Sequence, residues 1–282
     1  MAGQEHNYAE SELLYNALME PSLRAAIDRI PVPHDQARVL DAGCGPGGVF
    51  PIWAARLGST GTITGVDGSE AHLAAAQHLV ERHGLQDVVR LQVADLTQDL
   101  PLPPNAFDAV WIADVIYPSD FADPVVLVQR LSTVLKPGGT LAIFYGNWLR
   151  PLFLPGYARL EHLICATKEF AYADTRAWEG ALHPEMAAAW MRAAGLHDVH
   201  VDVLPSRHEQ PLPAQVRAYL GQHALPNYYG QPLLSHGHRV GLTEADRQLW
   251  QQLTDPTAAT YILDQPDYYC IASALLVTGR KP

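Results

Sequence analysis

Short apolar runs alternate with helical patterns along the first half of the 282-residue chain. Runs with the length of buried strands occupy residues 37–42, 62–67, 89–94, 107–113 and 139–145. Apolar residues at helical spacing fill the stretches between them, at residues 47–57, 70–83 and 122–135. Regular alternation of strands and helices predicts an α/β fold with a parallel, doubly wound sheet.

A helical pattern also precedes the first predicted strand. Residues 8–30 carry leucine, alanine and isoleucine side chains at the spacing of one or two amphipathic helices, with Pro21 as the expected break. Ligands of open α/β sheets bind outside the carboxyl ends of the strands. We therefore expect residues 1–36 to form an N-terminal helical lid over a ligand at that edge.

The second half of the chain adds a helical pattern at residues 184–194 and strand-like runs at His200–Leu204 and Tyr269–Thr278. These elements extend the predicted core over residues 37–206 and place its last strand within residues 265–282.

Two longer additions interrupt this core. One is an inserted segment at 147–181 with a helix-like stretch at 157–170, and the other is residues 207–264, rich in Pro, Gln, His and Tyr. We interpret 207–264 as a helical cap insertion rather than an independent domain. Additions at this edge of a sheet commonly enclose substrates.

Charge and cysteine content narrow the list of partners. The net charge is −11 and the Lys and Arg residues are scattered, which argues against a surface that follows nucleic-acid phosphates. Cys44, Cys165 and Cys270 have no C-x-x-C spacing, so neither a disulfide framework nor a metal site is predicted. No stretch reaches the ~20 apolar residues of a membrane span. We expect a cytoplasmic protein with no membrane partner, and a homodimer is compatible with the sequence.

A glycine-rich turn follows the first predicted strand. Residues 39–48 read Val-Leu-Asp-Ala-Gly-Cys-Gly-Pro-Gly-Gly, a strand that ends at Asp41 and a turn that opens into a helix. Glycines permit positive φ and let a ligand lie against the backbone beside a helix N-terminus. Asp41 would repel a pyrophosphate, but it suits a ligand with an ammonium and a sulfonium group, such as S-adenosylmethionine.

Five segments resemble, in order, the motifs of class I S-adenosylmethionine-dependent methyltransferases of the small-molecule type. They are residues 39–48, Ile63–Ser69, Val93–Leu96, Phe107–Pro118 and Leu135–Leu141. The resemblance implies a Rossmann-like seven-stranded sheet with an antiparallel last strand, here joined by helical cap insertions. It also implies an enzyme of EC 2.1.1 type, with S-adenosylmethionine as the cofactor and a specialised metabolite or quinone-like compound as the acceptor of the methyl group at an O, N or C atom.

The resemblance further implies roles for the matching residues. Asp41, Gly43 and Gly45 would hold the methionine end of the cofactor, and Asp67 would bind both ribose hydroxyls. The adenine contacts would be Gly68, Asp95 and Leu96, and the remaining predicted cofactor contacts are Cys44, Ser69, Ala94 and Ala113. Asp95 has a second interpretation, because aspartates near strand ends often serve as turn residues.

The sequence signals for residues that bind the methyl acceptor are less specific than those for the cofactor. Asp114 and Tyr117 follow the fourth predicted strand, above the expected position of the methyl group. The aromatic substrate-binding candidates are Tyr8, Tyr145 and Trp148, which could equally pack the additions onto the core. The catalytic residue is unknown from the sequence, and the candidate base is His208, at the junction of the penultimate strand and the cap. His183, before a helix start, has the pattern of a capping residue.

Two other functions remain open at this point. Gly43, Gly45 and Gly48 also satisfy G-x-G-x-x-G, and Asp67 follows 19 residues later, a spacing close to that of nicotinamide-dependent oxidoreductases. A protein that binds S-adenosylmethionine without transferring its methyl group would also explain the motifs. The segment after Ala113 lacks the Asn/Asp-Pro-Pro-Tyr motif of nucleic-acid amino-methyltransferases, which disfavours nucleobase substrates.

Overall fold

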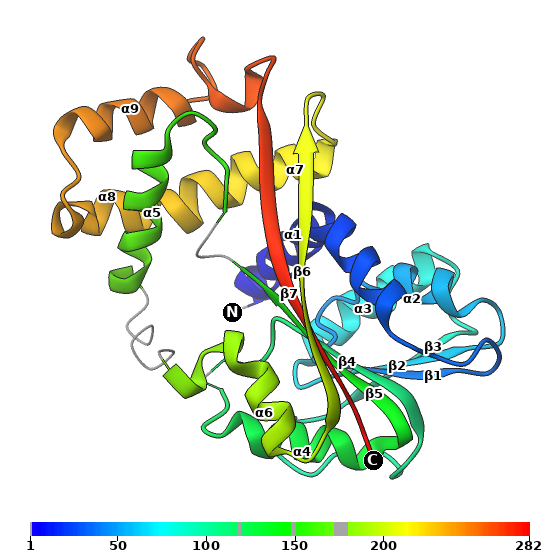
Figure 1. Ribbon diagram of the computed structural model, residues 1–282. Coiled ribbons are helices and arrows are strands. Elements are labelled where there is room, and N and C mark those ends of the chain that lie inside the picture. Colours follow the sequence, from blue (N-terminus) through cyan, green and yellow to red (C-terminus); the bar gives the residue numbers. More distant parts are fainter. Residues whose placement is uncertain (1, 118–119, 148–150, 172–179) are drawn as a thin grey trace.

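The computed structural model describes residues 2–117, 120–147, 151–171 and 180–282 (Figure 1). Seven strands form one sheet in the order β3-β2-β1-β4-β5-β7-β6. The strands are β1 (Arg38–Ala42), β2 (Thr62–Asp67), β3 (Val89–Val93), β4 (Phe107–Ala113), β5 (Leu135–Gly146), β6 (His197–Glu209) and β7 (Tyr269–Arg280). β1 to β5 pair in parallel, whereas β7 is antiparallel to both β5 and β6. The doubly wound, seven-stranded sheet with an antiparallel last strand is confirmed.

Alternate residues of the central strands enter two separate hydrophobic cores. On β1, Val39 belongs to one core while Leu40 and Ala42 belong to the other. The helices follow the same division. The first core includes α1 (Ala2–Arg29), α2 (Phe50–Leu57) and α3 (Glu70–Arg82), and the second includes α4 (Pro124–Val134) and α6 (Ala187–Ala193). Burial on both faces explains why these strands read as continuous apolar runs.

α1 is one continuous helix rather than the interrupted helix expected at Pro21. A proline inside a helix removes one backbone donor and disturbs the preceding turn. Two side chains of β6 compensate for this disturbance. The amide of Ser22 donates to Ser206 Oγ at 3.1 Å, and the carbonyl of Leu18 lies 2.8 Å from His208 Nε2. These tertiary hydrogen bonds replace helix hydrogen bonds that are missing near Pro21, so α1 continues without a break.

The two additions form one helical cap instead of two separate excursions. The helix α5 (Ala158–Ala171) packs against α8 (Gln231–His236), and Arg159 of α5 pairs with Asp246 of α9 (Glu244–Thr254) at 3.0 Å. The other elements of the cap are α7 (Ala214–Ala218), the π-helical stretch Tyr219–Gly230 and short 3-10 turns at Gly237–Val240 and Ile262–Asp264. In Figure 1 the helices of the cap lie beside the upper halves of β6 and β7, at the end of the sheet away from β3. Its buried residues join the same hydrophobic core as α1, and the assignment of 207–264 as an insertion of the core stays a prediction.

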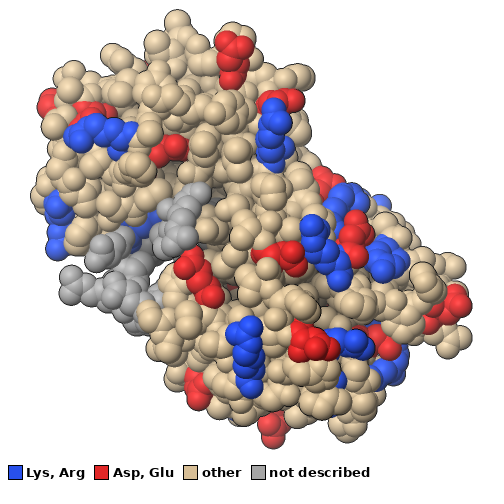
Figure 2. Space-filling view, in the orientation of Figure 1, with Lys and Arg blue, Asp and Glu red and all other residues tan. Residues whose placement is uncertain are grey.

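The distribution of surface charge and the length and polarity of the helices are relevant to binding of nucleic acids and membranes. On the face seen in Figure 2, Lys and Arg are interspersed with Asp and Glu rather than gathered into one basic area. Over the described residues, every helix is too short or too polar to cross a membrane.

Candidate functional site

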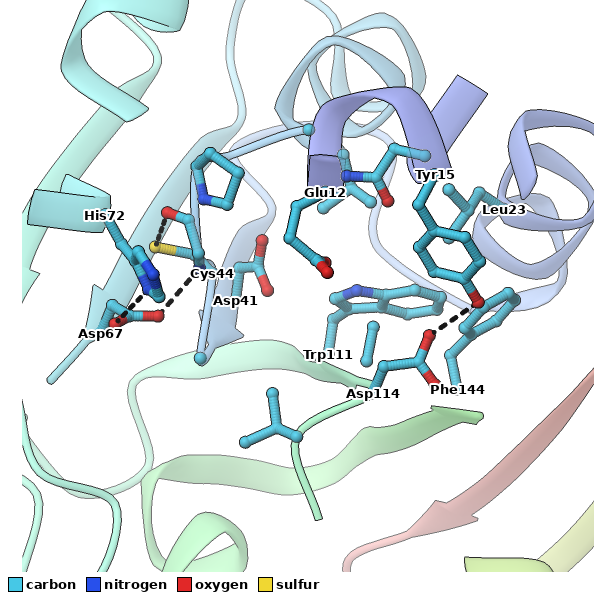
Figure 3. Close-up of a pocket in the computed structure, with 18 of the residues that line it drawn as sticks. Glu12, Tyr15, Leu23, Asp41, Cys44, Asp67, His72, Trp111, Asp114 and Phe144 are labelled. Atoms are coloured by element: carbon cyan, nitrogen blue, oxygen red, sulfur yellow. Dashed lines mark hydrogen bonds and ion pairs between the residues drawn. The ribbon is translucent and has the colours of Figure 1, made fainter. Parts of the chain in front are cut away.

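A cavity of about 250 Å³ lies at the carboxyl ends of β1, β2, β4 and β5, with α1 as its outer wall (Figure 3). Its position agrees with the general rule for open α/β sheets. The lining residues that carry the argument below are Glu12, Tyr15, Asn16, Asp41, Gly43, Cys44, Gly45, Asp67, His72, Trp111, Ala113, Asp114, Tyr117, Asp120 and Phe144. α1 supplies one side of the cavity, and its role as a lid over a ligand stays a prediction.

The three glycines of the G-x-G-x-x-G pattern serve different needs. Gly43 has φ +74°, and a Cβ there would lie 2.5 Å from Val115 Cγ2. Gly48 leaves room for Asn16, whose Nδ2 would lie 2.0 Å from an added Cβ. Only Gly45, at φ +50°, faces open space, with no atom within 4 Å of the Cβ position. Gly45 is therefore the glycine that keeps a ligand surface clear, while the other two allow close packing.

Asp41 and Trp111 present a buried acceptor and a buried donor side by side. They are register partners on the parallel strands β1 and β4, so their side chains project from the same face of the sheet. Within the described residues, neither Asp41 Oδ2 nor Trp111 Nε1 has a hydrogen-bond partner. Burial, reinforced by the nearby charge of Asp67, raises the pKa of Asp41 to about 8. Buried polar atoms are normally paired, so this pair indicates a ligand that carries both a donor and an acceptor.

Asp67 ends β2 and holds the glycine turn in place. Its Oδ2 accepts the amide of Gly45 at 2.9 Å, and its Oδ1 accepts the amide of Ser69 at 2.9 Å and lies 3.3 Å from His72 Nδ1. Burial would raise the pKa of Asp67, but these hydrogen bonds, led by the one from His72, hold the pKa below its ordinary value. An ionised carboxylate therefore lies at one end of the cavity, beside Cys44.

Asp114 anchors the other end of the cavity. Its Oδ2 accepts a hydrogen bond from Tyr15 Oη at 3.1 Å, and its Oδ1 accepts the amide of Gly146 at 2.7 Å. The backbone of Asp114 has φ +52°, a conformation that is uncommon outside glycine and often marks functional positions. Burial raises the pKa of this carboxyl to about 6, against the lowering effect of its two hydrogen bonds. The predicted partner Tyr117 lines the same region.

The adenine contacts expected after β3 are not part of the cavity lining in the described structure. The carboxylate of Asp95 accepts the amide and the hydroxyl of Thr97, at 2.8 and 2.7 Å, and is exposed. Its interpretation as a turn residue is thus the one with structural support. Ala94 and Leu96 are buried in the second core. Ser69 caps α3 by accepting the amide of His72.

Some residues predicted to bind the methyl acceptor do not line the cavity. Tyr145 is buried and contacts His183 edge to face, with ring centroids 6.0 Å apart. His183 itself accepts the amide of Glu185 as a helix cap, as its pattern indicates. Trp148 and the side chain of Tyr8 lie outside the described residues. Of the three predicted pocket aromatics, Tyr145 is the one whose side chain the structure describes, and it packs against His183 instead of lining the cavity.

The candidate base His208 is a structural residue. It does not line the cavity, and its Nε2 must carry the proton that it donates to the carbonyl of Leu18, because a carbonyl only accepts. The strand-like pattern could not show that β6 continues to Glu209 and turns this side chain toward α1.

We expect His208→Ala to lower the free energy of unfolding by about 1–3 kcal/mol, since it leaves a helix carbonyl without a partner beside Pro21. Denaturant unfolding measures this change. Calorimetric affinity for ligands of the cavity should stay within about twofold of the wild type. A large loss of affinity with unchanged stability would restore His208 as a site residue.

The residues of the site that the sequence analysis does not name include Glu12, Asn16, His72, Trp111 and Asp120. A usable signal existed for two of them. His72 lies in the first turn of the helix after Asp67, and Trp111 occupies the strand position opposite Asp41. The positions of Glu12 and Asn16 depend on how α1 crosses the sheet, which no local pattern reveals.

Comparison with known proteins agrees with this geometry. A family profile described as "Methyltransferase domain" matches residues 40–143. The ubiquinone biosynthesis O-methyltransferase of Xylella fastidiosa (strain 9a5c) is 31% identical over 167 residues, which are 59% of this chain and 63% of that protein. The trans-aconitate 2-methyltransferase of Delftia acidovorans is 40% identical over 118 residues, 40% of this chain and 39% of that protein. The chain thus spans less than two thirds of the length of these curated relatives.

Solved structures share the fold. The YcgJ protein of Bacillus subtilis superposes with a TM-score of 0.56 at 16% identity, over 92% of this chain and 97% of that one. The phosphoethanolamine N-methyltransferase 2 of Haemonchus contortus gives 0.54 at 18% identity, over 98% of this chain and 58% of that one. Residues 40–143 thus form a methyltransferase domain, and the strand order and the glycine turn at the end of β1 support a class I S-adenosylmethionine-dependent methyltransferase.

Proposed function

We propose that this protein transfers the methyl group of S-adenosylmethionine to a small molecule held between α1 and the ends of β4 and β5. The observation that carries the proposal is a single cavity with two differently built ends. One end has the open face of Gly45, the unpartnered Asp41 and the ionised Asp67. The other has Tyr15 and Asp114.

The cofactor end fits the chemical groups of S-adenosylmethionine. Its amino-acid part carries an ammonium and a carboxylate, which complement the acceptor of Asp41 and the donor of Trp111. Asp67 is the carboxylate suited to ribose hydroxyls. Gly45 offers bare backbone for close approach. A pyrophosphate of a nicotinamide dinucleotide would meet two carboxylates here, so the oxidoreductase alternative fits less well.

When bound, S-adenosylmethionine supplies an electrophilic methyl group on its sulfonium. The residues of the chain then act mainly by position. Tyr15 and the amide of Gly146 fix the carboxylate of Asp114, so a polar group of the acceptor can be held in one place. α1 and Phe144 wall the cavity, which limits water at the reacting atoms. Asp114, rather than His208, is placed to take a proton from the acceptor.

Isothermal titration calorimetry with S-adenosylmethionine, S-adenosylhomocysteine and NADH tests the cofactor. We expect both adenosyl ligands to bind with a Kd on the order of micromolar, which corresponds to a binding free energy of about −8 kcal/mol. We expect no binding of NADH. Binding of NADH alone would refute the proposal and favour the oxidoreductase. A protein that binds the adenosyl ligands but transfers no methyl group to any member of a broad acceptor screen would match the third function.

Asp67→Ala should weaken S-adenosylmethionine binding by about 1–3 kcal/mol, because it removes acceptors for the ribose and releases the amide of Gly45. The same calorimetry measures the loss. The matched control is Asp87→Ala, at an exposed aspartate of the loop before β3, which should bind like the wild type. Unchanged affinity of Asp67→Ala would remove this residue from the site.

A further inference from the structure

We propose that the methyl acceptor is an amine that enters the cavity as an ammonium ion and is methylated at that nitrogen. This inference rests on the methyl transfer proposed above and adds the substrate class. It is carried by the charge of the acceptor end, by the geometry of Asp114 and by the aromatic walls.

The cavity is strongly acidic. Its described lining contains five carboxyl groups, those of Glu12, Asp41, Asp67, Asp114 and Asp120, of which Asp41 is mostly protonated at neutral pH until a ligand binds, because burial raises its pKa to about 8. The same lining has neither a lysine nor an arginine among the described residues, and His72 is committed to Asp67. Clefts lined by one sign of charge concentrate ligands of the opposite sign. The site therefore selects a cation.

The cofactor uses only part of this charge. Asp41 and Asp67 belong to its end, where Asp41 lines the cavity and its buried Oδ2 has no hydrogen-bond partner among the described residues. Glu12, Asp114 and Asp120 are the other carboxyl groups of the lining, and Asp114 is the one that lies with Tyr15 at the acceptor end. S-adenosylmethionine has two cationic groups and one carboxylate, so it brings one net positive charge and leaves the acceptor end acidic. An anionic acceptor such as a tricarboxylate would meet like charges there.

Asp114 is built as an anchor. Tyr15 and the amide of Gly146 each occupy one of its two oxygens from the protein side. A carboxylate oxygen accepts more than one hydrogen bond, so both oxygens can also receive an N–H from the cavity. The backbone at φ +52° holds this side chain over the end of β4.

Aromatic rings also line the cavity, and Trp111, whose Nε1 faces the cofactor end, extends toward Asp114. Tyr15, Trp111, Tyr117 and Phe144 all line the cavity, and Trp111 and Phe144 lie with their ring centroids 5.4 Å apart. Figure 3 shows Asp114 between Trp111, Tyr15 and Phe144. Ring faces attract cations and exclude water. A carboxylate surrounded by rings is a suitable receptor for an alkyl- or arylammonium group.

The reaction balances without another reactant. The ammonium nitrogen gives one proton to the Asp114 carboxylate, and its freed lone pair forms a bond to the methyl carbon. The carbon–sulfur bond breaks, and its electron pair stays on sulfur as a neutral thioether. The product is the methylated ammonium, and the proton on Asp114 passes to solvent.

The test compares probes that share a frame and differ in charge, bound to the complex of the full chain with S-adenosylhomocysteine. One set is 2-phenylethylamine, 2-phenylethanol and phenylacetate, and the other is butylamine, butanol and butyrate. We expect each amine to bind at least about tenfold more tightly than its alcohol and acid, as a charged hydrogen bond to a carboxylate would give. Equal affinities, no binding by any member, or preference for an alcohol or acid would overturn the inference.

Two variants separate this inference from general effects. Asp114→Asn keeps the shape of the side chain and should reduce the preference for amines about 10- to 100-fold. Glu10→Gln, exposed on α1 and outside the cavity lining, should leave the preference unchanged. Prior titration with S-adenosylhomocysteine alone keeps the two proposals apart. Failure of that step removes the proposed function, whereas its success without an amine preference removes only the substrate class.

Discussion

Gly45→Ala is expected to reduce affinity for S-adenosylmethionine by about 10- to 100-fold, the 1–3 kcal/mol typical of an extra methyl group in a filled site. The added Cβ meets no protein atom within 4 Å, because it enters the cavity itself. The loss should therefore appear in ligand binding rather than in packing. Calorimetric titration of the variant measures it.

Folding cost must be separated from this effect, since Gly45 has φ +50° and alanine is strained in that region by ~1–2 kcal/mol. Gly84→Ala is the matched control. Gly84 has φ +65° and open space around its Cβ position, but it follows α3 at the surface, away from the cavity. Both variants should lose similar stability in denaturant unfolding, and only Gly45→Ala should lose affinity. Equal binding by the two would mean that no ligand lies against Gly45.

The sheet could be predicted from the sequence because its signals are local. Each parallel strand is buried on both faces, so it reads as an apolar run, and each helix between strands repeats its apolar side chains every three to four residues. Some strand boundaries in the structure differ from the predicted ones because of how the strands pair. β5 begins at Leu135 instead of near residue 139, because Leu135 pairs with Phe107 before a register shift.

The cofactor end of the site was predictable for a related reason. Asp41, Gly45 and Asp67 lie at strand ends and turns, where position along the chain determines position in the fold. The carboxylate of Asp95 accepts local hydrogen bonds from Thr97, and its contact with the adenine stays a prediction.

The acceptor end depends on contacts between distant segments. Tyr15 reaches Asp114 across 99 positions of the chain, and His208 reaches Leu18 across 190. The cap adds a further case. It was expected to enclose the substrate, yet its described residues support α1 from behind, as Tyr219 does against Tyr15, with ring centroids 5.7 Å apart. Periodicity cannot reveal which segment packs on which.

Asp41→Asn should make the unliganded protein more stable and the complex weaker. A carboxyl whose pKa is about 4 when unfolded and about 8 when folded binds its proton more tightly in the native state. Stability then falls as pH rises from about 4 to about 8, by up to roughly 1.4 kcal/mol per pH unit. Asparagine cannot ionise and escapes this loss. Between pH 5 and pH 8 the variant should gain on the order of 2–4 kcal/mol relative to the wild type.

Whereas Asp41→Asn should increase the stability of the free protein, it should weaken the binding of S-adenosylmethionine. The ammonium of the ligand favours the ionised form of Asp41, so the wild type should release a proton when S-adenosylmethionine binds near pH 7. Calorimetry in buffers of different ionisation enthalpy detects this proton. Asp41→Asn should lose both the proton release and about 10- to 100-fold in affinity.

Higher stability of the free protein together with weaker ligand binding distinguishes a ligand-binding carboxylate from a structural one. If Asp41 only supported the fold, its substitution would make the protein less stable. Asp99→Asn, at an exposed position, is the control and should alter neither quantity. If Asp41→Asn follows the wild type in its stability between pH 5 and pH 8, the carboxylate is not buried without a partner in solution. If the variant binds S-adenosylmethionine as tightly as the wild type, the ammonium lies elsewhere, and the acceptor of Asp41 serves another group of the ligand.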